Sequence, residues 1–162
     1  MHVHLSEYDE RWPSWFERIR HALPEGLVAE HVGSTSVPRL LAKPIVDVDV
    51  VIESADSVAG VLALLGAAGW AHEGDGGIPG REAFESRPDL PPHHLYRVVR
   101  GSAPHRDHTD LRDHLRASTE DAVRYSDVKR SLAHLLPHDR AAYTEGKAAI
   151  VSELLSRSRE RG

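Results

Sequence analysis

The chain contains no cysteine, a single methionine and few aromatic residues, which make up 6% of the sequence. Without cysteine it can form no disulfide, no thiolate nucleophile and no zinc site with sulfur ligands. No apolar run approaches the roughly 18–20 residues of a membrane-spanning helix. The N-terminal residues also lack the apolar core of a signal peptide. These absences predict a soluble cytoplasmic protein with no membrane partner.

Excess positive charge is missing as well. The net charge is -5 and the isoelectric point about 6.2, so no global basic field marks a polynucleotide partner, although a local basic lining remains open. A length of 162 residues is typical of one domain. We therefore expect a single domain over residues 1–162, large enough to fold around its own core.

The order of apolar patterns predicts an α+β fold, with helices packed on a small mixed β-sheet and a helical C-terminal part. Residues 33–44 and the segment 74–92, which is rich in glycine and proline, are expected to be loops. Strands are predicted over 27–32, 45–52, 70–73 and 94–99, and helices over 12–22, 57–68, 109–117, 119–135 and 139–157.

Two aspartates interrupt the most apolar predicted strand. Asp47 and Asp49 are two residues apart, so they project from the same face of a strand, while the apolar residues between them project from the other. Neighbouring carboxylates repel each other and resist leaving water. A hard divalent cation, Mg²⁺ or Mn²⁺, would stabilise them, because it prefers carboxylate and phosphate oxygens. The alternative is an exposed edge strand whose acids are simply solvated.

A short loop precedes this strand, with the sequence Gly33-Ser34-Thr35-Ser36. Glycine lets a backbone approach a ligand closely, and the amides and hydroxyls that follow can donate hydrogen bonds to phosphate oxygens. Lys43 adds a cation nearby. Taken alone, the loop is more typical of a plain turn. Together with the acid pair, it favours a site that binds a divalent cation and phosphate oxygens.

Six segments, in this order, resemble the GrpB (UPF0157) family: HVGSTSVPRLLAKPIVDVDVVI, GIPGREAF, HHLYRVV, LRDHLR, YSDVK and AYTEGK. The Gly-Ser pair followed by Asp-x-Asp also resembles the nucleotidyltransferase superfamily, which includes polymerase-β-like enzymes. This resemblance implies a nucleotidyltransferase-like fold and Mg²⁺ (or Mn²⁺) held by Asp47 and Asp49. It further implies a nucleoside triphosphate (NTP) substrate and an unknown acceptor. The acidic net charge favours a small-molecule acceptor over a polynucleotide.

The sequence departs from that superfamily in one respect. Its enzymes usually take a third carboxylate from a later strand, whereas HHLYRVV has none. His94 could replace this acid as ligand or general base, or it could be a structural histidine. Arg81 could clamp a phosphate or lie on the surface. The directions of Glu82 and Glu85 are not fixed by the sequence.

The C-terminal part carries further candidates, for which the less specific interpretation is favoured. Four cations could line a cleft but are expected to solvate helix faces: Arg112, Arg116, Lys129 and Lys147. Tyr125 and Tyr143 could stack on a base but are expected to pack in the core. The histidines and aspartates of residues 105–114 lack a recognised zinc spacing, and no zinc site is predicted there.

Two hypotheses of function follow. The first is a metal-dependent transferase in which an acceptor hydroxyl attacks the α-phosphorus of an NTP. The second is a non-catalytic nucleotide-binding, folding-helper or regulatory module on the same fold. The resemblance supports the second because GrpB members occur fused to dephospho-coenzyme A kinase. The acceptor, the preferred base and the oligomeric state are left open by the sequence.

Overall fold

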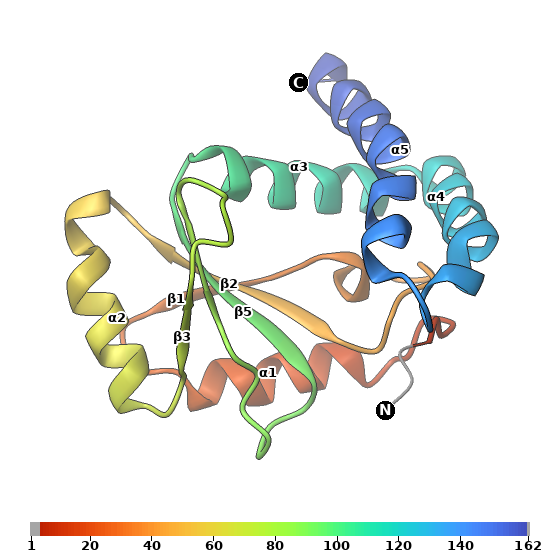
Figure 1. Ribbon diagram of the computed structural model, residues 1–162. Helices are drawn as coiled ribbons and strands as arrows, with labels where there is room; N and C mark the ends of the chain where they lie inside the picture. The colour runs from red at the N-terminus through yellow and green to blue at the C-terminus, as the bar shows by residue number, and fades with distance from the viewer. Residues whose placement is uncertain (1–3, 162) are drawn as a thin grey trace.

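The computed structural model describes residues 4–161. A five-stranded sheet forms its centre, with the strand order β1-β2-β5-β4-β3 (Figure 1). β2 and β5 pair in parallel, and every other neighbouring pair is antiparallel. The sheet is therefore mixed, as predicted. The strands are β1 Val28–Val32, β2 Val46–Ile52, β3 His72–Gly74, β4 Arg81–Phe84 and β5 His93–Val99.

One face of the sheet carries the main apolar core. Helix α1 (Trp12–Ala22) runs beneath this face, and α2 (Val58–Ala67) packs beside it (Figure 1). Alternate residues of β2 point into this core, and Val46, Val48 and Val50 are fully buried. Because side chains alternate along a strand, this burial directs Asp47 and Asp49 to the opposite face.

The opposite face is crossed by α3 (Ala103–Ala117), which lies above the sheet in Figure 1. Beyond its end follow α4 (Thr119–Leu132), the 3₁₀ turn Ala133–Leu135 and α5 (Arg140–Arg161). These helices enclose a second apolar cluster around Leu115, Tyr125 and Leu154, to which the loop after β1 contributes Leu40. The helical C-terminal part is thus packed against the residues that connect β1 to β2.

The predicted elements are largely confirmed, although β3 begins at His72 rather than residue 70 and α5 continues to Arg161, past the predicted end at residue 157. Two larger corrections are needed. The segment 74–92 is not loop throughout, because residues 81–84 form β4, which pairs with β5. Helix α3 begins at Ala103 rather than near residue 109, with Pro104 in its first turn, a position that tolerates proline. No helix within residues 4–161 combines the length and apolarity needed to cross a membrane.

Candidate functional site

The acidic strand lies inside the sheet. β2 is flanked by β1 and β5, so the alternative of an exposed edge strand with solvated acids is wrong. Both aspartates share one face, as expected from their spacing, but their surroundings differ. The Asp47 side chain is 30% exposed, whereas that of Asp49 is completely buried. Asp47 therefore faces a cavity, and Asp49 lies beneath other side chains.

The turn after β1 brings the backbone against Asp47. Gly33 has φ 78° and ψ -166°, a conformation essentially restricted to glycine. A Cβ atom on Gly33 would lie 2.9 Å from Cγ of Asp47 and closer still to Oδ2. Glycine is thus required here both by the backbone angles and by the close approach of the carboxylate. Ser34–Ser36 then form a single 3₁₀ turn.

A cavity of about 260 Å³ opens in front of Asp47. It is bounded by the turn after β1, the starts of β2 and β5, and helices α4 and α5. Four of the predicted site residues line it, namely Ser34, Lys43, Asp47 and His94. The remaining lining residues are Ala42, Ile45, Tyr96, Lys129, Tyr143 and Lys147.

The lysines of this cavity are the only lysines in the sequence. The 162-residue chain contains three, Lys43, Lys129 and Lys147, compared with 17 arginines. All three line the same cavity. A compact ammonium group binds phosphate as a point charge, whereas arginine provides a planar fork. The distribution of lysine thus marks this cavity as a candidate site for a phosphorylated ligand.

Lys129 is the most deeply buried of the three, with 2% of its surface exposed. Its Nζ donates hydrogen bonds to Ser34 Oγ (2.6 Å) and to the carbonyl oxygen of Leu41 (2.8 Å). Burial lowers the pKa of Lys129 well below its ordinary value, and the charge of Lys147 lowers it further. The expectation that Lys129 solvates a helix face is therefore wrong. It joins α4 to the turn after β1.

Lys43 and Lys147 approach the ring of Tyr143 on α5, with Nζ atoms 5.7 and 4.6 Å from its centroid. Burial lowers the pKa of Lys147 to about 8, and the nearby charge of Lys43 contributes. Burial also lowers the pKa of Lys43. None of the three lysines forms an ion pair with a carboxylate of residues 4–161. An anionic ligand would relieve both the desolvation and the mutual repulsion of these ammonium groups.

Tyr143 and Tyr125 are buried, as the favoured interpretation of core packing requires. Lys147, however, was expected to be solvated and instead forms part of the cavity wall. The helical pattern alone could not reveal this, because the wall forms only when α5 packs beside residues 34–47.

His94 lies next to Asp47, on the neighbouring strand β5. Its Nδ1 is 3.3 Å from Asp47 Oδ1 and 3.3 Å from the hydroxyl oxygen of Tyr96. The parallel register pairs Asp47 with His94 and Asp49 with Tyr96. The position at which a third carboxylate was sought is thus occupied by an imidazole that can accept a proton at the cavity.

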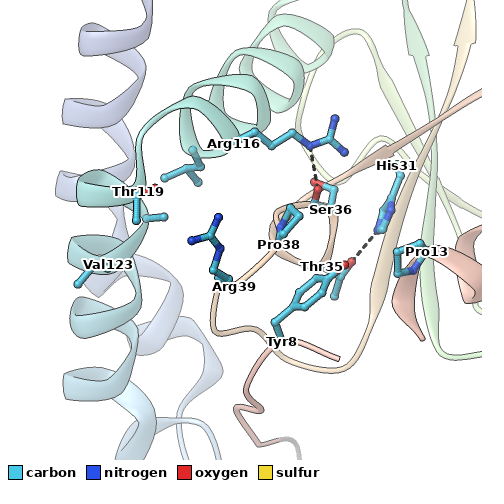
Figure 2. Close-up of a pocket in the computed structure, with 12 residues that line it drawn as sticks. Tyr8, Pro13, His31, Thr35, Ser36, Pro38, Arg39, Arg116, Thr119 and Val123 are labelled. Carbon is cyan, nitrogen blue, oxygen red and sulfur yellow. Dashed lines mark hydrogen bonds between the residues drawn. The ribbon is translucent and has the colours of Figure 1, made fainter. Parts of the chain in front are cut away.

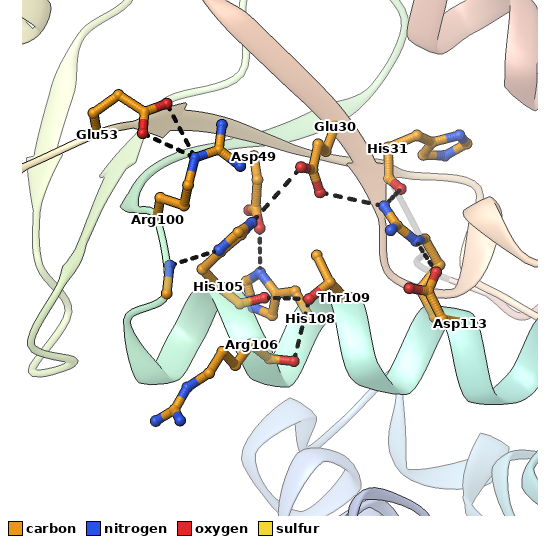
Figure 3. Close-up of polar contacts among 12 residues, drawn as sticks. Glu30, His31, Asp49, Glu53, Arg100, His105, Arg106, His108, Thr109 and Asp113 are labelled. Atoms are coloured by element: carbon orange, nitrogen blue, oxygen red, sulfur yellow. Dashed lines mark hydrogen bonds and ion pairs between the residues drawn. The ribbon is translucent and has the colours of Figure 1, made fainter. Parts of the chain in front are cut away.

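Asp49 is held by a histidine from α3 (Figure 3). His108 Nδ1 lies 2.7 Å from Asp49 Oδ2, while Oδ1 of Asp49 has no hydrogen-bond partner within residues 4–161. Burial raises the pKa of Asp49, against the hydrogen bond from His108. Burial lowers the pKa of His108, but the hydrogen bond and charge of Asp49 outweigh it, so that this pKa lies above its ordinary value.

Glu30 is a carboxylate of this site that no sequence motif indicates. It pairs directly with Asp49 across β1 and β2 and lies on the same face of the sheet. Its oxygens are 3.7 Å from His105 Nε2 and 3.4 Å from Arg112 Nη1, as Figure 3 shows. Arg112 was expected to solvate a helix face, but it links α3 to β1 instead.

The acid pair suits a metal ion only together with a ligand. Within residues 4–161, no three His, Asp or Glu side chains are grouped so that they could hold a metal ion by themselves. Mg²⁺, however, usually takes one or two carboxylates and completes its shell with substrate phosphates and water. The exposed carboxylate of Asp47 fits that arrangement. Oδ1 of Asp49 has no hydrogen-bond partner within residues 4–161, but it is buried and Asp49 does not line the cavity, so Asp49 could join the shell only if the side chains that cover it moved.

The other predicted site residues lie outside the cavity. Thr35 hydroxyl and His31 Nε2 are 2.9 Å apart, and Ser36 lines a separate hollow together with Thr35. Arg81, on β4, places its guanidinium carbon 4.6 Å from the centre of the Tyr96 ring. Arg81 shares the face of the sheet that carries the aspartates but does not line the cavity.

Comparison with known proteins identifies the family. The model of the family described as "GrpB protein" matches residues 2–157. The chain belongs to the GrpB family. A UPF0157 protein of Streptomyces coelicolor is 36% identical, over 98% of this chain and 85% of that protein. A UPF0157 protein of Bacillus subtilis is 31% identical over 90% of this chain, but the chain spans only 44% of the length of that relative.

A GrpB crystal structure shares the fold. The conserved protein GrpB of Enterococcus faecalis superimposes with a TM-score of 0.77 and 28% sequence identity. The match covers 94% of this chain and 98% of that one. The α+β architecture described above is therefore found in a second member of the GrpB family.

Proposed function

We propose that this GrpB protein is a metal-dependent nucleotidyltransferase with a nucleotidyltransferase-like fold, which transfers a nucleotidyl group from an NTP to a small hydroxyl-bearing acceptor. The observation that carries the proposal is the convergence of all three lysines with Asp47 and Ser34 in one cavity. Three lysines next to a single lining carboxylate favour a ligand with several negative charges, such as a triphosphate, whose charge would also stabilise the protonated form of each lysine.

Each residue has a role that its position supports. Lys43, Lys129 and Lys147 bind the phosphates, and Ser34 donates to a phosphate oxygen once Lys129 turns to the ligand. Asp47 and Asp49 would hold Mg²⁺ (or Mn²⁺), which would neutralise charge that develops on the attacking and leaving oxygens.

The acceptor hydroxyl attacks the α-phosphorus, and its proton passes to His94, next to Asp47. The bond between the α-phosphorus and the bridging oxygen breaks, and pyrophosphate leaves with the negative charge that the lysines stabilise. His94 thus supplies the base that the missing third carboxylate would have provided.

A second candidate is a non-catalytic nucleotide-binding or regulatory module on the same fold. It is favoured by the engagement of Asp49 with His108 and by the absence of a carboxylate on β5. Such a module would bind the nucleotide in the same lysines and release no pyrophosphate. Turnover therefore separates the two candidates, while binding tests the site that they share.

The test measures NTP binding by calorimetry with Mg²⁺ or Mn²⁺, and pyrophosphate release with a panel of small hydroxyl acceptors. Lys147→Met and Asp47→Asn should each weaken binding at least about tenfold, since each removes one charge from the contact with the ligand or its metal. Arg18→Met, which removes an exposed cation from α1, is the matched control and should bind as the wild type does. Equal binding by all four proteins would disprove the site, and metal-dependent binding without release would favour the module.

A further inference from the structure

A second cavity lies on the other side of the turn after β1 (Figure 2). Its volume is about 470 Å³, within the range of small-molecule sites. Ser34 faces the lysine-lined cavity, whereas Thr35 and Ser36, the next two residues, line this one. Its other walls come from the end of α3, the start of α4 and the segment around Tyr8. The two cavities are thus separated by a single turn of backbone.

Two arginines contribute positive charge to this second cavity. Arg116 Nε donates a hydrogen bond to the carbonyl oxygen of Ser36 (2.9 Å), as Figure 2 shows. Neither Arg116 nor Arg39 forms an ion pair with a carboxylate in the part of the chain described, residues 4–161. Asp113 acts on Arg116 only at longer range and is bonded to Arg112 instead (2.8 Å). Both guanidinium groups therefore have donors available to a ligand.

The backbone at Arg39 is in an unusual conformation. Arg39 has φ 71° and is the one non-glycine residue among 4–161 with a positive φ. Such a conformation is sparsely populated by residues with a side chain and occurs preferentially at functional sites. Here it is held by the buried neighbours Val37 and Leu40. The strained position directs a charged side chain to the cavity where glycine would fit the backbone better.

The rest of the lining is mainly apolar. Leu115 and Ala122 are buried beneath the cavity, and Val123 at its rim is 54% exposed. His31 adds no positive charge near neutral pH, because burial, against the charge of Asp47 and with smaller contributions from Arg116 and Arg112, lowers its pKa to about 4. Two guanidinium groups beside an apolar wall favour a ligand with one anionic end and an apolar body.

We propose that this cavity binds a small carboxylate with an aromatic or aliphatic body, held by Arg39 and Arg116 and packed against Leu115 and Val123. A planar guanidinium fork matches a carboxylate in two parallel hydrogen bonds. The compact ammonium groups that suit phosphate all lie in the other cavity. The site is independent of the proposed nucleotidyl transfer, since no lining residue of this cavity also lines the first.

The probe is benzoate, titrated into the full chain and followed by protein-observed NMR. A dissociation constant on the order of 1 mM is expected for a ligand of this size. Arg116→Gln should weaken binding about tenfold or more, because it removes a charge-assisted hydrogen bond. Arg39→Gly should do the same while it relieves the strained backbone, so loss of folding cannot explain the result. Arg106→Gln, an exposed arginine elsewhere on α3, should bind benzoate as the wild type does.

Competition distinguishes the two cavities. Benzyl alcohol, which has the ring without the charge, should bind at least tenfold more weakly, and saturating pyrophosphate should not displace benzoate. Displacement by pyrophosphate would place the probe in the lysine-lined cavity and overturn the proposal. Unchanged binding to Arg39→Gly and Arg116→Gln, or no binding at concentrations well above 1 mM, would overturn it as well.

Discussion

Replacing Gly33 by alanine tests whether the turn after β1 is fixed by Asp47. The backbone angles of Gly33 are essentially restricted to glycine, and holding another residue there costs about 2 kcal/mol. The new Cβ would also lie 2.9 Å from Cγ of Asp47, and displacing a packed side chain costs about a further 2 kcal/mol. We therefore expect Gly33→Ala to lower the free energy of unfolding by about 4 kcal/mol.

Gly26→Ala provides the matched control. Gly26 also has a positive φ, of 89°, but a Cβ atom there would meet nothing within 4 Å. Its substitution should cost only the backbone strain, about 1–2 kcal/mol. Urea titration followed by tryptophan fluorescence measures both, since Trp12 and Trp70 are buried and change environment on unfolding.

A double-mutant cycle with Asp47→Ala isolates the clash. That substitution removes Oδ2 and Cγ, two of the three atoms closest to the new Cβ, while the Cβ of residue 47 remains at 3.0 Å. The cost of Gly33→Ala should then fall to about 2 kcal/mol, the backbone share alone. The close approach of Gly33 and Asp47 would be refuted if Gly33→Ala in the wild type cost no more than Gly26→Ala. It would also be refuted if the cost of Gly33→Ala were the same with and without Asp47→Ala.

Three further predictions concern charge. Folding lowers the pKa of His31 from 6.5 to about 4. The contribution of His31 to the free energy of unfolding should therefore be fully present above pH 6.5 and fall by about 3 kcal/mol towards pH 4. Urea midpoints that change equally with pH in wild type and His31→Phe would contradict this. Pyrophosphate affinity should decrease as pH rises through about 8, where Lys147 loses its charge. Calorimetry should show this decrease in the wild type but not in Lys147→Met, and a flat profile in both proteins would contradict the prediction. Reductive methylation, read by mass spectrometry, should modify Lys147 faster than buried Lys129, and pyrophosphate should protect Lys147. A rate for Lys147 that pyrophosphate does not change would contradict binding of pyrophosphate in this cavity.

Local patterns predicted the elements that carry their own signal. Helix α1 and strand β2 were found within a residue of their observed bounds, because a helical period and alternating burial are both legible in short windows. Strand β4 was missed because its four residues, Arg81–Phe84, include two charges and follow glycines. It forms a strand because β5 pairs with it, and the ion pair between Glu82 and Arg97 (3.3 Å) spans the two.

The candidate site was predicted only in part, because some of its residues come from segments that are distant in the sequence. Ser34 and Asp47 lie close together because one connection joins β1 to β2, which are consecutive in the sequence. His94 was a candidate only through the resemblance to nucleotidyltransferases, because the pairing of β5 with β2 does not follow from sequence order. Lys129 and Lys147 lie on helices α4 and α5, which contact the turn after β1 only in the folded chain. The helical pattern of the sequence therefore does not indicate that these lysines line a cavity. The small number of lysines could have indicated the site, because a chain with only three lysines and many arginines suggests that each lysine has a specific role.

The lysine-lined cavity joins residues from nearly the whole length of the polypeptide. Ser34 belongs to its first quarter, while Tyr143 and Lys147 belong to α5, the last helix. During synthesis, the first half of the chain leaves the ribosome before α5 is made. This half contains both aspartates and Gly33, and α5 completes the wall of the cavity. The proposed affinity for a polyphosphate therefore requires α5 to be synthesised and docked, because the residues before α5 leave the cavity without Tyr143 and Lys147.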